Sequence, residues 1–172
     1  RQLAVTFSLL RENTLYWNYY IENYLKGKEP SDFDILYWNS DGTNIPAKIH
    51  NFLLRNLYLN NELISPNAVK VNGVGLNLSR VKTPSFFIAT QEDHIGLWDT
   101  FFRGADYLGG ESTLVLGESG HVAGIVNPPS RNKYGCYTNA AKFENTKQWL
   151  DGAEYHPESW WLRWQAWVTP YT

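Results

Sequence analysis

The sequence lacks several features that mark large classes of protein. Its 172 residues include one cysteine and no methionine, and no apolar run approaches the roughly 20 residues needed to cross a bilayer. One cysteine excludes an internal disulfide, and there is no CxxC or Cys/His pair typical of zinc sites, so we expect a reducing compartment. The 15 basic and 17 acidic residues leave a net charge of −2, which gives no electrostatic reason to expect nucleic acid as the partner.

The absence of methionine bears on whether the chain is complete. A complete translation product begins with methionine, whereas this chain begins at Arg1 and shows no signal-peptide pattern there. Either the chain is part of a longer protein or processing has removed a leader, and we favour the first. Its composition, with 43% hydrophobic and 16% aromatic residues, is typical of a folded globular domain rather than a disordered chain.

The first half of the chain is predicted to be mainly helical. The spacing of apolar residues predicts a helix over residues 1–26, with a break near Asn13, and another over residues 47–63. Residues 33–46 combine a short apolar segment with turn residues. Alternating residues and two glycines over 68–81 predict a short hairpin.

The second half predicts an α/β fold. The apolar runs at 86–89 and 112–117 predict two buried strands, and residues 97–108 between them predict a helix. Two strands joined by a helix imply a parallel sheet. A second helix is expected over residues 139–153. Because two strands make a poor sheet, we expect part of the domain to lie outside this chain.

Two polar residues follow the predicted strands, where open parallel sheets collect catalytic groups. Asp93 follows the first strand and His121 the second. We expect the carboxylate to accept the Nδ1 proton of the imidazole, which would fix the tautomer and stabilise the imidazolium. In the α/β-hydrolase fold the acid also precedes the histidine, and the nucleophile lies upstream of both. No G-x-[SC]-x-G nucleophile elbow occurs in residues 1–92.

Each of these residues also has a structural interpretation. Asp93 suits a helix N-cap or a loop carboxylate, and His121 suits a satisfied turn residue. The neighbouring His94 either lines the site or is structural. The order and context of Asp93 and His121 favour acid–base chemistry. Cys136, the only thiol, follows His121 in an expected loop with no preceding strand, so we do not propose it as the nucleophile and expect an ordinary, partly buried cysteine.

Several stretches together resemble one enzyme family. They include "YLNNELISP", "EDHI" with Trp98, "LGESGHVAGIVNPP" and "ESWWLRWQAW". This combination resembles the C-terminal part of polyhydroxyalkanoate synthases, and most closely the single-subunit class I type that polymerises short 3-hydroxyacyl groups. The resemblance covers nearly the whole chain.

The resemblance implies a fold and a catalytic triad. It implies the C-terminal part of an α/β-hydrolase core over residues 81–172, preceded by a largely helical cap segment over residues 1–80. In the family, a Cys–His–Asp triad takes an acyl group from a 3-hydroxyacyl-CoA thioester. The histidine motif matches at His121, which would deprotonate the thiol. The aspartate motif matches at Asp93, which would orient the histidine and in one alternative also activate the 3-hydroxyl. The family's G-x-C-x-G box is absent, so we expect this chain alone to be inactive.

The resemblance also implies partners and a location. Trp38 matches a family position near the active site, and its alternative is a core aromatic of the cap. The implied partners are 3-hydroxyacyl-CoA, the growing polyester and the surface of a polymer granule in the cytoplasm. A second copy of this protein is expected to bind through the cap. No separate cofactor and no metal are implied. The tryptophans over 160–167 either pack on the domain or contact the granule. The alternative functions are part of another α/β-hydrolase such as an esterase or lipase, and a non-catalytic granule- or partner-binding protein.

Overall fold

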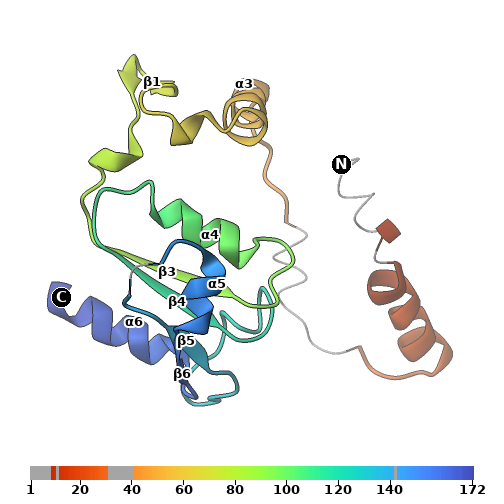
Figure 1. Cartoon of the computed structure of the whole chain (residues 1–172). Helices are drawn as coiled ribbons and strands as arrows, with labels where there is room; N and C mark the ends of the chain where they lie inside the picture. The colour runs from red at the N-terminus through yellow and green to blue at the C-terminus, as the bar shows by residue number, and fades with distance from the viewer. Residues whose placement is uncertain (1–8, 11, 31–40, 142) are drawn as a thin grey trace. The chain divides into compact units, whose positions relative to one another are not determined.

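The structure of the chain is a computed structural model that describes residues 9–10, 12–30, 41–141 and 143–172 (Figure 1). The chain divides into two compact units, Arg1–Pro46 and Ala47–Thr172. Among the described residues, every helix falls short of the length and apolar character that a membrane-spanning helix needs.

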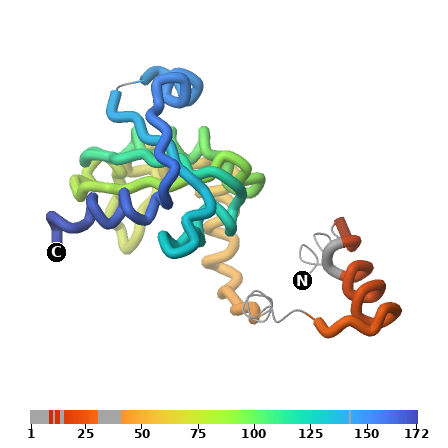
Figure 2. The backbone as a smooth tube through the Cα atoms, turned by 90° about the horizontal axis from the view of Figure 1, so that it is seen from below, coloured from red at the N-terminus to blue at the C-terminus, as the bar shows by residue number. Residues whose placement is uncertain are grey.

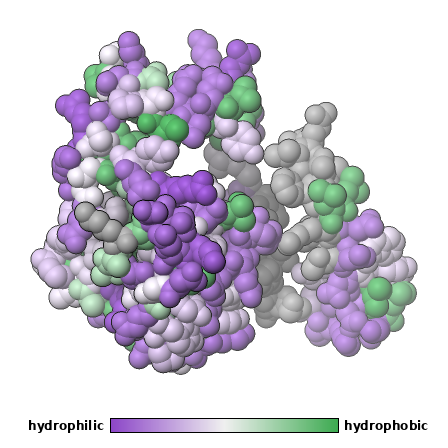
Figure 3. All heavy atoms as spheres, viewed as in Figure 1, coloured by the Kyte–Doolittle hydropathy of each residue, from purple (hydrophilic) through white to green (hydrophobic). Residues whose placement is uncertain are grey.

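In the first unit, residues 12–25 form one helical run. It contains η1 (Asn13–Trp17) and η2 (Tyr20–Leu25), which are π-helices with wide turns. The helix predicted over residues 1–26 is confirmed for this part, and the possible break near Asn13 does not occur within residues 12–25, where the backbone stays helical. Apolar residues remain on the surface of this unit (Figure 3), and Tyr24 is 76% exposed.

The second unit begins with a helix and a hairpin. The helix consists of α3 (Ala47–Phe52) and η3 (Leu53–Leu59), continuous in Figure 2, and the short η4 (Glu62–Ile64) follows it. The predicted helix over residues 47–63 therefore ends early, at Leu59. The predicted hairpin is confirmed, because β1 (Lys70–Val71) pairs antiparallel with β2 (Val74–Gly75). Its central Asn72 and Gly73 both have positive φ, at 51° and 81°, as a tight two-residue hairpin turn requires. The single turn η5 (Leu78–Arg80) comes next.

A four-stranded mixed sheet in the order β3-β4-β5-β6 organises the rest of this unit. Its strands are β3 (Ser85–Thr90), β4 (Ser112–Gly117), β5 (Cys136–Thr138) and β6 (Glu154–His156). The two predicted strands are confirmed as β3 and β4, which pair in parallel from Ser85↔Ser112 to Thr90↔Gly117. The antiparallel strands β5 and β6 are additions that the predicted parallel sheet did not contain. Within the described residues, β3 pairs on one side only.

Helices cover both faces of the sheet (Figure 1). They are α4 (Trp98–Ala105), α5 (Thr146–Asp151) and α6 (Trp160–Val168), with the last turn η6 (Thr169–Tyr171). Neighbouring residues of a strand point to opposite faces. Phe87 accordingly contacts Phe101 of α4, whereas Phe86 contacts Trp160 and Trp167 of α6. The predicted helix over 97–108 is confirmed by α4, but the helix predicted over 139–153 is confined to α5, because the residues described before it, 139–141 and 143–145, form a loop.

The apolar core lies between the sheet and the helices α4 and α5. Trp149 of α5 is completely buried and contacts Phe102 of α4 edge-to-face, with ring centroids 4.8 Å apart. Leu114 and Leu116 of β4 lie in the same cluster. This packing fixes the positions of β3 and β4, and therefore of the loops that follow them.

Candidate active site

Asp93 lies in the loop after β3, where backbone contacts hold its carboxylate. The Asp93 N–H donates to the Thr90 carbonyl at 3.2 Å. Asp93 Oδ1 accepts from the N–H groups of Ile95 and Gly96 at 2.8 and 2.9 Å. The second carboxylate oxygen, Oδ2, lies 2.8 Å from Nδ1 of His121. The structure therefore brings Asp93 and His121 into direct contact.

Hydrogen bonding sets the charge and the tautomer of this pair. Partial burial of the Asp93 carboxyl favours its neutral form, but hydrogen bonds from the Gly96 N–H, the His121 ring and the Ile95 N–H outweigh burial and lower its pKa to about 2. An ionised carboxylate only accepts hydrogen bonds, so Nδ1 carries a proton, and the lone pair of the neutral ring is on Nε2. The His121 side chain is 48% exposed, so Nε2 can act as a general base.

Backbone hydrogen bonds join the two loops that carry the pair. The Gln91 N–H donates to the Gly117 carbonyl at 2.9 Å, and the Glu92 N–H donates to the Ser119 carbonyl at 3.0 Å. These bonds continue the parallel pairing beyond the ends of β3 and β4. Ser119 has φ of 68°, a left-handed conformation that costs a non-glycine residue roughly 1–2 kcal/mol. This conformation turns the chain from β4 toward His121.

Glu118 anchors the histidine loop to β5 and β6. Its backbone N–H donates to the Gly135 carbonyl at 3.1 Å. Its side-chain Oε2 accepts from the Gly135 N–H at 2.7 Å and from the Tyr155 hydroxyl at 3.3 Å. Neither Glu118 nor Ser119 was predicted from the sequence, where the only signal for them is their position between the strand and His121.

Two further residues, His94 and Trp38, were predicted for the site. His94 is exposed beside Asp93 in the sequence, and its role stays a prediction. Trp38 lies outside the described residues.

Cys136 is the first residue of β5, so its predicted loop location is wrong. A strand of three residues is too short to show a pattern in the sequence. The side chain is completely buried rather than partly buried, and its Sγ lies 3.7 Å from the Glu158 carbonyl. Burial raises the pKa of the Cys136 thiol to about 11, which disfavours the thiolate that nucleophilic catalysis needs.

The tryptophans of α6 fall into two groups. Trp160 and Trp167 pack on Phe86 of β3, with ring centroids 6.3 and 5.4 Å away, which supports the packing interpretation for these two. Trp161 and Trp164 are 37% and 46% exposed, so the granule-contact interpretation stays open for them.

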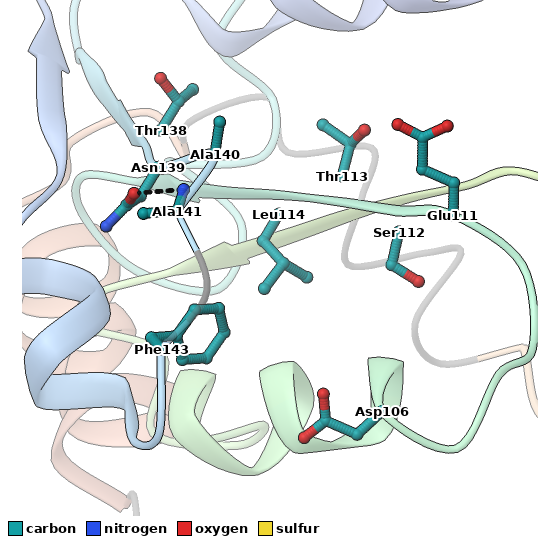
Figure 4. Close-up of a pocket in the computed structure, with 10 residues that line it drawn as sticks. All are labelled: Asp106, Glu111, Ser112, Thr113, Leu114, Thr138, Asn139, Ala140, Ala141 and Phe143. Carbon is teal, nitrogen blue, oxygen red and sulfur yellow. Dashed lines mark hydrogen bonds between the residues drawn. The ribbon is translucent and has the colours of Figure 1, made fainter.

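A cavity of about 520 Å³ lies at the opposite end of β4 from the pair (Figure 4). It exists because β5 pairs only with Val115 to Gly117 of β4 and the chain then turns away at Asn139. Figure 4 shows Leu114 and Phe143 beside it, with carboxylates from Asp106 and Glu111 at its margin. Neither Asp93 nor His121 lines this cavity, so it is separate from the candidate active site.

Comparison with known proteins identifies the chain's relatives. No family model matches. The chain is 45% identical over 167 residues to the poly(3-hydroxyalkanoate) polymerase subunit PhaC of Cupriavidus necator, covering 97% of this chain and 28% of that protein. It is 45% identical over 167 residues to PhaC of Rhizobium meliloti, covering 97% and 27%. It is 40% identical over 167 residues to poly(3-hydroxyalkanoate) polymerase 1 of Ectopseudomonas oleovorans, covering 97% and 30%.

The matches cover nearly all of this chain but only a part of each relative. The chain spans only 27% to 30% of the length of these curated relatives. The aligned region nevertheless covers 97% of this chain, and therefore includes both loops of the Asp–His pair. The resemblance seen in the sequence motifs is confirmed, and the chain is homologous to part of the poly(3-hydroxyalkanoate) polymerases.

Proposed function

We propose that this chain is the C-terminal part of the catalytic domain of an enzyme that polymerises 3-hydroxyacyl groups from coenzyme A thioesters. The observation that carries the proposal is the 2.8 Å contact between Asp93 and His121 after two parallel strands, in a chain homologous to poly(3-hydroxyalkanoate) polymerases. The same placement supports an α/β-hydrolase core over residues 81–172, and the family resemblance assigns residues 1–80 to a cap.

In this proposal the nucleophile is a cysteine thiol carried by a segment outside this chain. His121 Nε2 accepts the thiol proton, and the thiolate sulfur attacks the carbonyl carbon of the acyl-CoA thioester. A new carbon–sulfur bond forms, the bond to coenzyme A breaks, and the departing thiolate takes the proton from His121. Asp93 stabilises the imidazolium while it carries that proton.

Chain growth follows when the oxygen of a 3-hydroxyl attacks an acyl thioester and its proton passes to His121. The released sulfur then recovers that proton, so the pair returns to its starting state. The proposal requires no metal and no resident cofactor, because 3-hydroxyacyl-CoA is the substrate. It also includes a homodimer formed through the cap and a location at polymer granules in the cytoplasm.

No observation favours the two alternative functions. An esterase or lipase shares the acid and histidine loops, but the relatives named above are polymerases. A protein that only binds granules has no need for an imidazole whose tautomer is set by an ionised carboxylate.

Two proteins test the proposal, namely this chain alone and the full-length polymerase that contains it. Each is incubated with 3-hydroxybutyryl-CoA, and the release of coenzyme A is measured. We expect release by the full-length protein, none by the chain alone, and loss of release in full-length His121→Ala but not in His50→Ala, an exposed histidine of α3. Release by the chain alone, or full activity of His121→Ala, would overturn the proposal.

A further inference from the structure

His121 begins a short helical turn that follows β4. Within this turn, the Gly124 N–H donates to the Gly120 carbonyl at 2.9 Å, and the Val126 N–H donates to the Val122 carbonyl at 2.8 Å. A single turn leaves its last carbonyls without helical partners. The Ile125 carbonyl accepts from the Asn127 N–H at 3.0 Å, and further support for this end of the turn, and with it for the position of the imidazole, comes from donors elsewhere in the chain.

The start of α6 supplies those donors. The indole N–H of Trp160 lies 3.2 Å from the Gly124 carbonyl oxygen and 3.1 Å from that of Ile125. The indole N–H of Trp161 donates to the Ile125 carbonyl at 3.0 Å. Two adjacent tryptophans, remote in sequence from His121, thus cap the carbonyl end of the histidine turn.

Ser159 fixes the helix start to the segment that follows the turn. Its hydroxyl donates to the Asn127 carbonyl, and both residues are buried. The same hydroxyl oxygen accepts from the Trp161 N–H at 3.2 Å, so Ser159 also caps the N-terminus of α6. The two indoles therefore project from a helix end that is itself fixed to the loop.

The turn also packs tightly against the sheet. A Cβ atom built on Gly124 would lie 2.4 Å from the Glu118 carbonyl oxygen and 2.5 Å from Cγ2 of Thr90. Thr90 is the last residue of β3 and Glu118 directly follows β4, so both atoms lie where the two catalytic loops begin. The turn has little room to shift toward the sheet, and the indole bonds hold its carbonyl end.

We propose that Trp160 and Trp161 are positioning residues for His121. Their indole N–H groups fix the carbonyl end of the histidine turn and thereby hold the imidazole against Asp93. The Trp160 ring is oriented for this by its packing on Phe86. The catalytic part of this inference rests on the proposed function, whereas the capping itself does not. It gives the tryptophan-rich tail a role in the active site that granule contact does not require.

The test uses the full-length polymerase with Trp160→Phe, Trp161→Phe and the double variant, because phenylalanine keeps an aromatic ring and removes the N–H. The matched control is Trp164→Phe, which changes an exposed tryptophan of the same helix. Hydrogen exchange over residues 120–127 reports the turn, and CoA release gives kcat and KM. Each lost donor should speed exchange in this segment about fivefold. In the double variant kcat should fall about tenfold with KM little changed, because the imidazole and not the substrate site is displaced.

Hydrogen exchange decides the capping, and kcat decides the positioning role. Unchanged exchange in the double variant, or an equal change in Trp164→Phe, overturns the capping. Faster exchange with an unchanged kcat overturns the positioning role. A wild-type polymerase that releases no CoA overturns the proposed function, while the exchange data still decide the capping. If the phenylalanine variants do not fold, β-(3-benzothienyl)alanine at residue 161, which replaces the N–H by sulfur in a ring of similar size, provides the same comparison.

Discussion

Replacing Asp93 by asparagine should disable the Asp–His pair with almost no change in shape. The new Oδ1 can still accept from the N–H groups of Ile95 and Gly96, but an amide Nδ2 then faces His121 Nδ1. A donor at this position requires Nδ1 to accept. The ring proton therefore moves to Nε2, which can no longer serve as a base.

The size of the effect follows from the geometry. Two unit charges about 4 Å apart interact with about 4 kcal/mol at an effective dielectric constant near 20. Because the His121 side chain is 48% exposed, solvent reduces this stabilisation to about 2 kcal/mol, which corresponds to about 30-fold in rate. The reversed tautomer adds to this loss, so we expect CoA release to slow by at least about 100-fold.

The assay is CoA release from 3-hydroxybutyryl-CoA by the full-length Asp93→Asn enzyme. Asp99→Asn is the matched control, because it removes a carboxylate that pairs with Arg103 at 3.5 Å on the surface of α4. We expect the control to keep the wild-type rate. An Asp93→Asn enzyme that also keeps it would refute the assignment of the tautomer and of the carboxylate's role.

Three further predictions concern stability and the buried thiol. The pKa of Asp93 is lowered from 3.8 to about 2, so its ionisation stabilises the fold above pH 3.8 and this contribution is lost as the pH falls through about 2. The difference in unfolding free energy between wild type and Asp93→Asn, measured with urea, should shrink by about 1 kcal/mol over that range, and a pH-independent difference would contradict this. Cys136 should resist alkylation by iodoacetamide in the folded protein, and Cys136→Ala should keep CoA release in the full-length enzyme while losing about 1 kcal/mol of stability; selective loss of activity would show that the thiol takes part. Trp149→Ala should lower the unfolding free energy by about 3–5 kcal/mol, whereas Trp164→Ala should change it far less, and equal effects would place the core elsewhere.

The structure explains why some elements could be predicted and others could not. Strands β3 and β4 are six-residue strands built around short apolar runs, and α4 carries an apolar face, so local sequence patterns are sufficient to find them. Strands β5 and β6 have three residues each, which is too few for any periodicity. Strand β5 forms because it can hydrogen-bond to the edge of β4, and β6 forms because it can hydrogen-bond to the edge of β5. The predicted loop at Cys136 was wrong for the same reason.

The sequence by itself determined the family, the α/β class and the two residues most suited to acid–base chemistry, because each depends on motifs or on short periodic patterns. The tertiary structure decided how those residues are held. Only the folded chain shows the Asp93–His121 contact, the left-handed Ser119 that turns toward it and the Glu118 anchor on Gly135. It also separates the tryptophans that pack or cap, including the partly exposed Trp161, from the exposed Trp164. These features depend on contacts between residues that are distant along the chain, which no local pattern records.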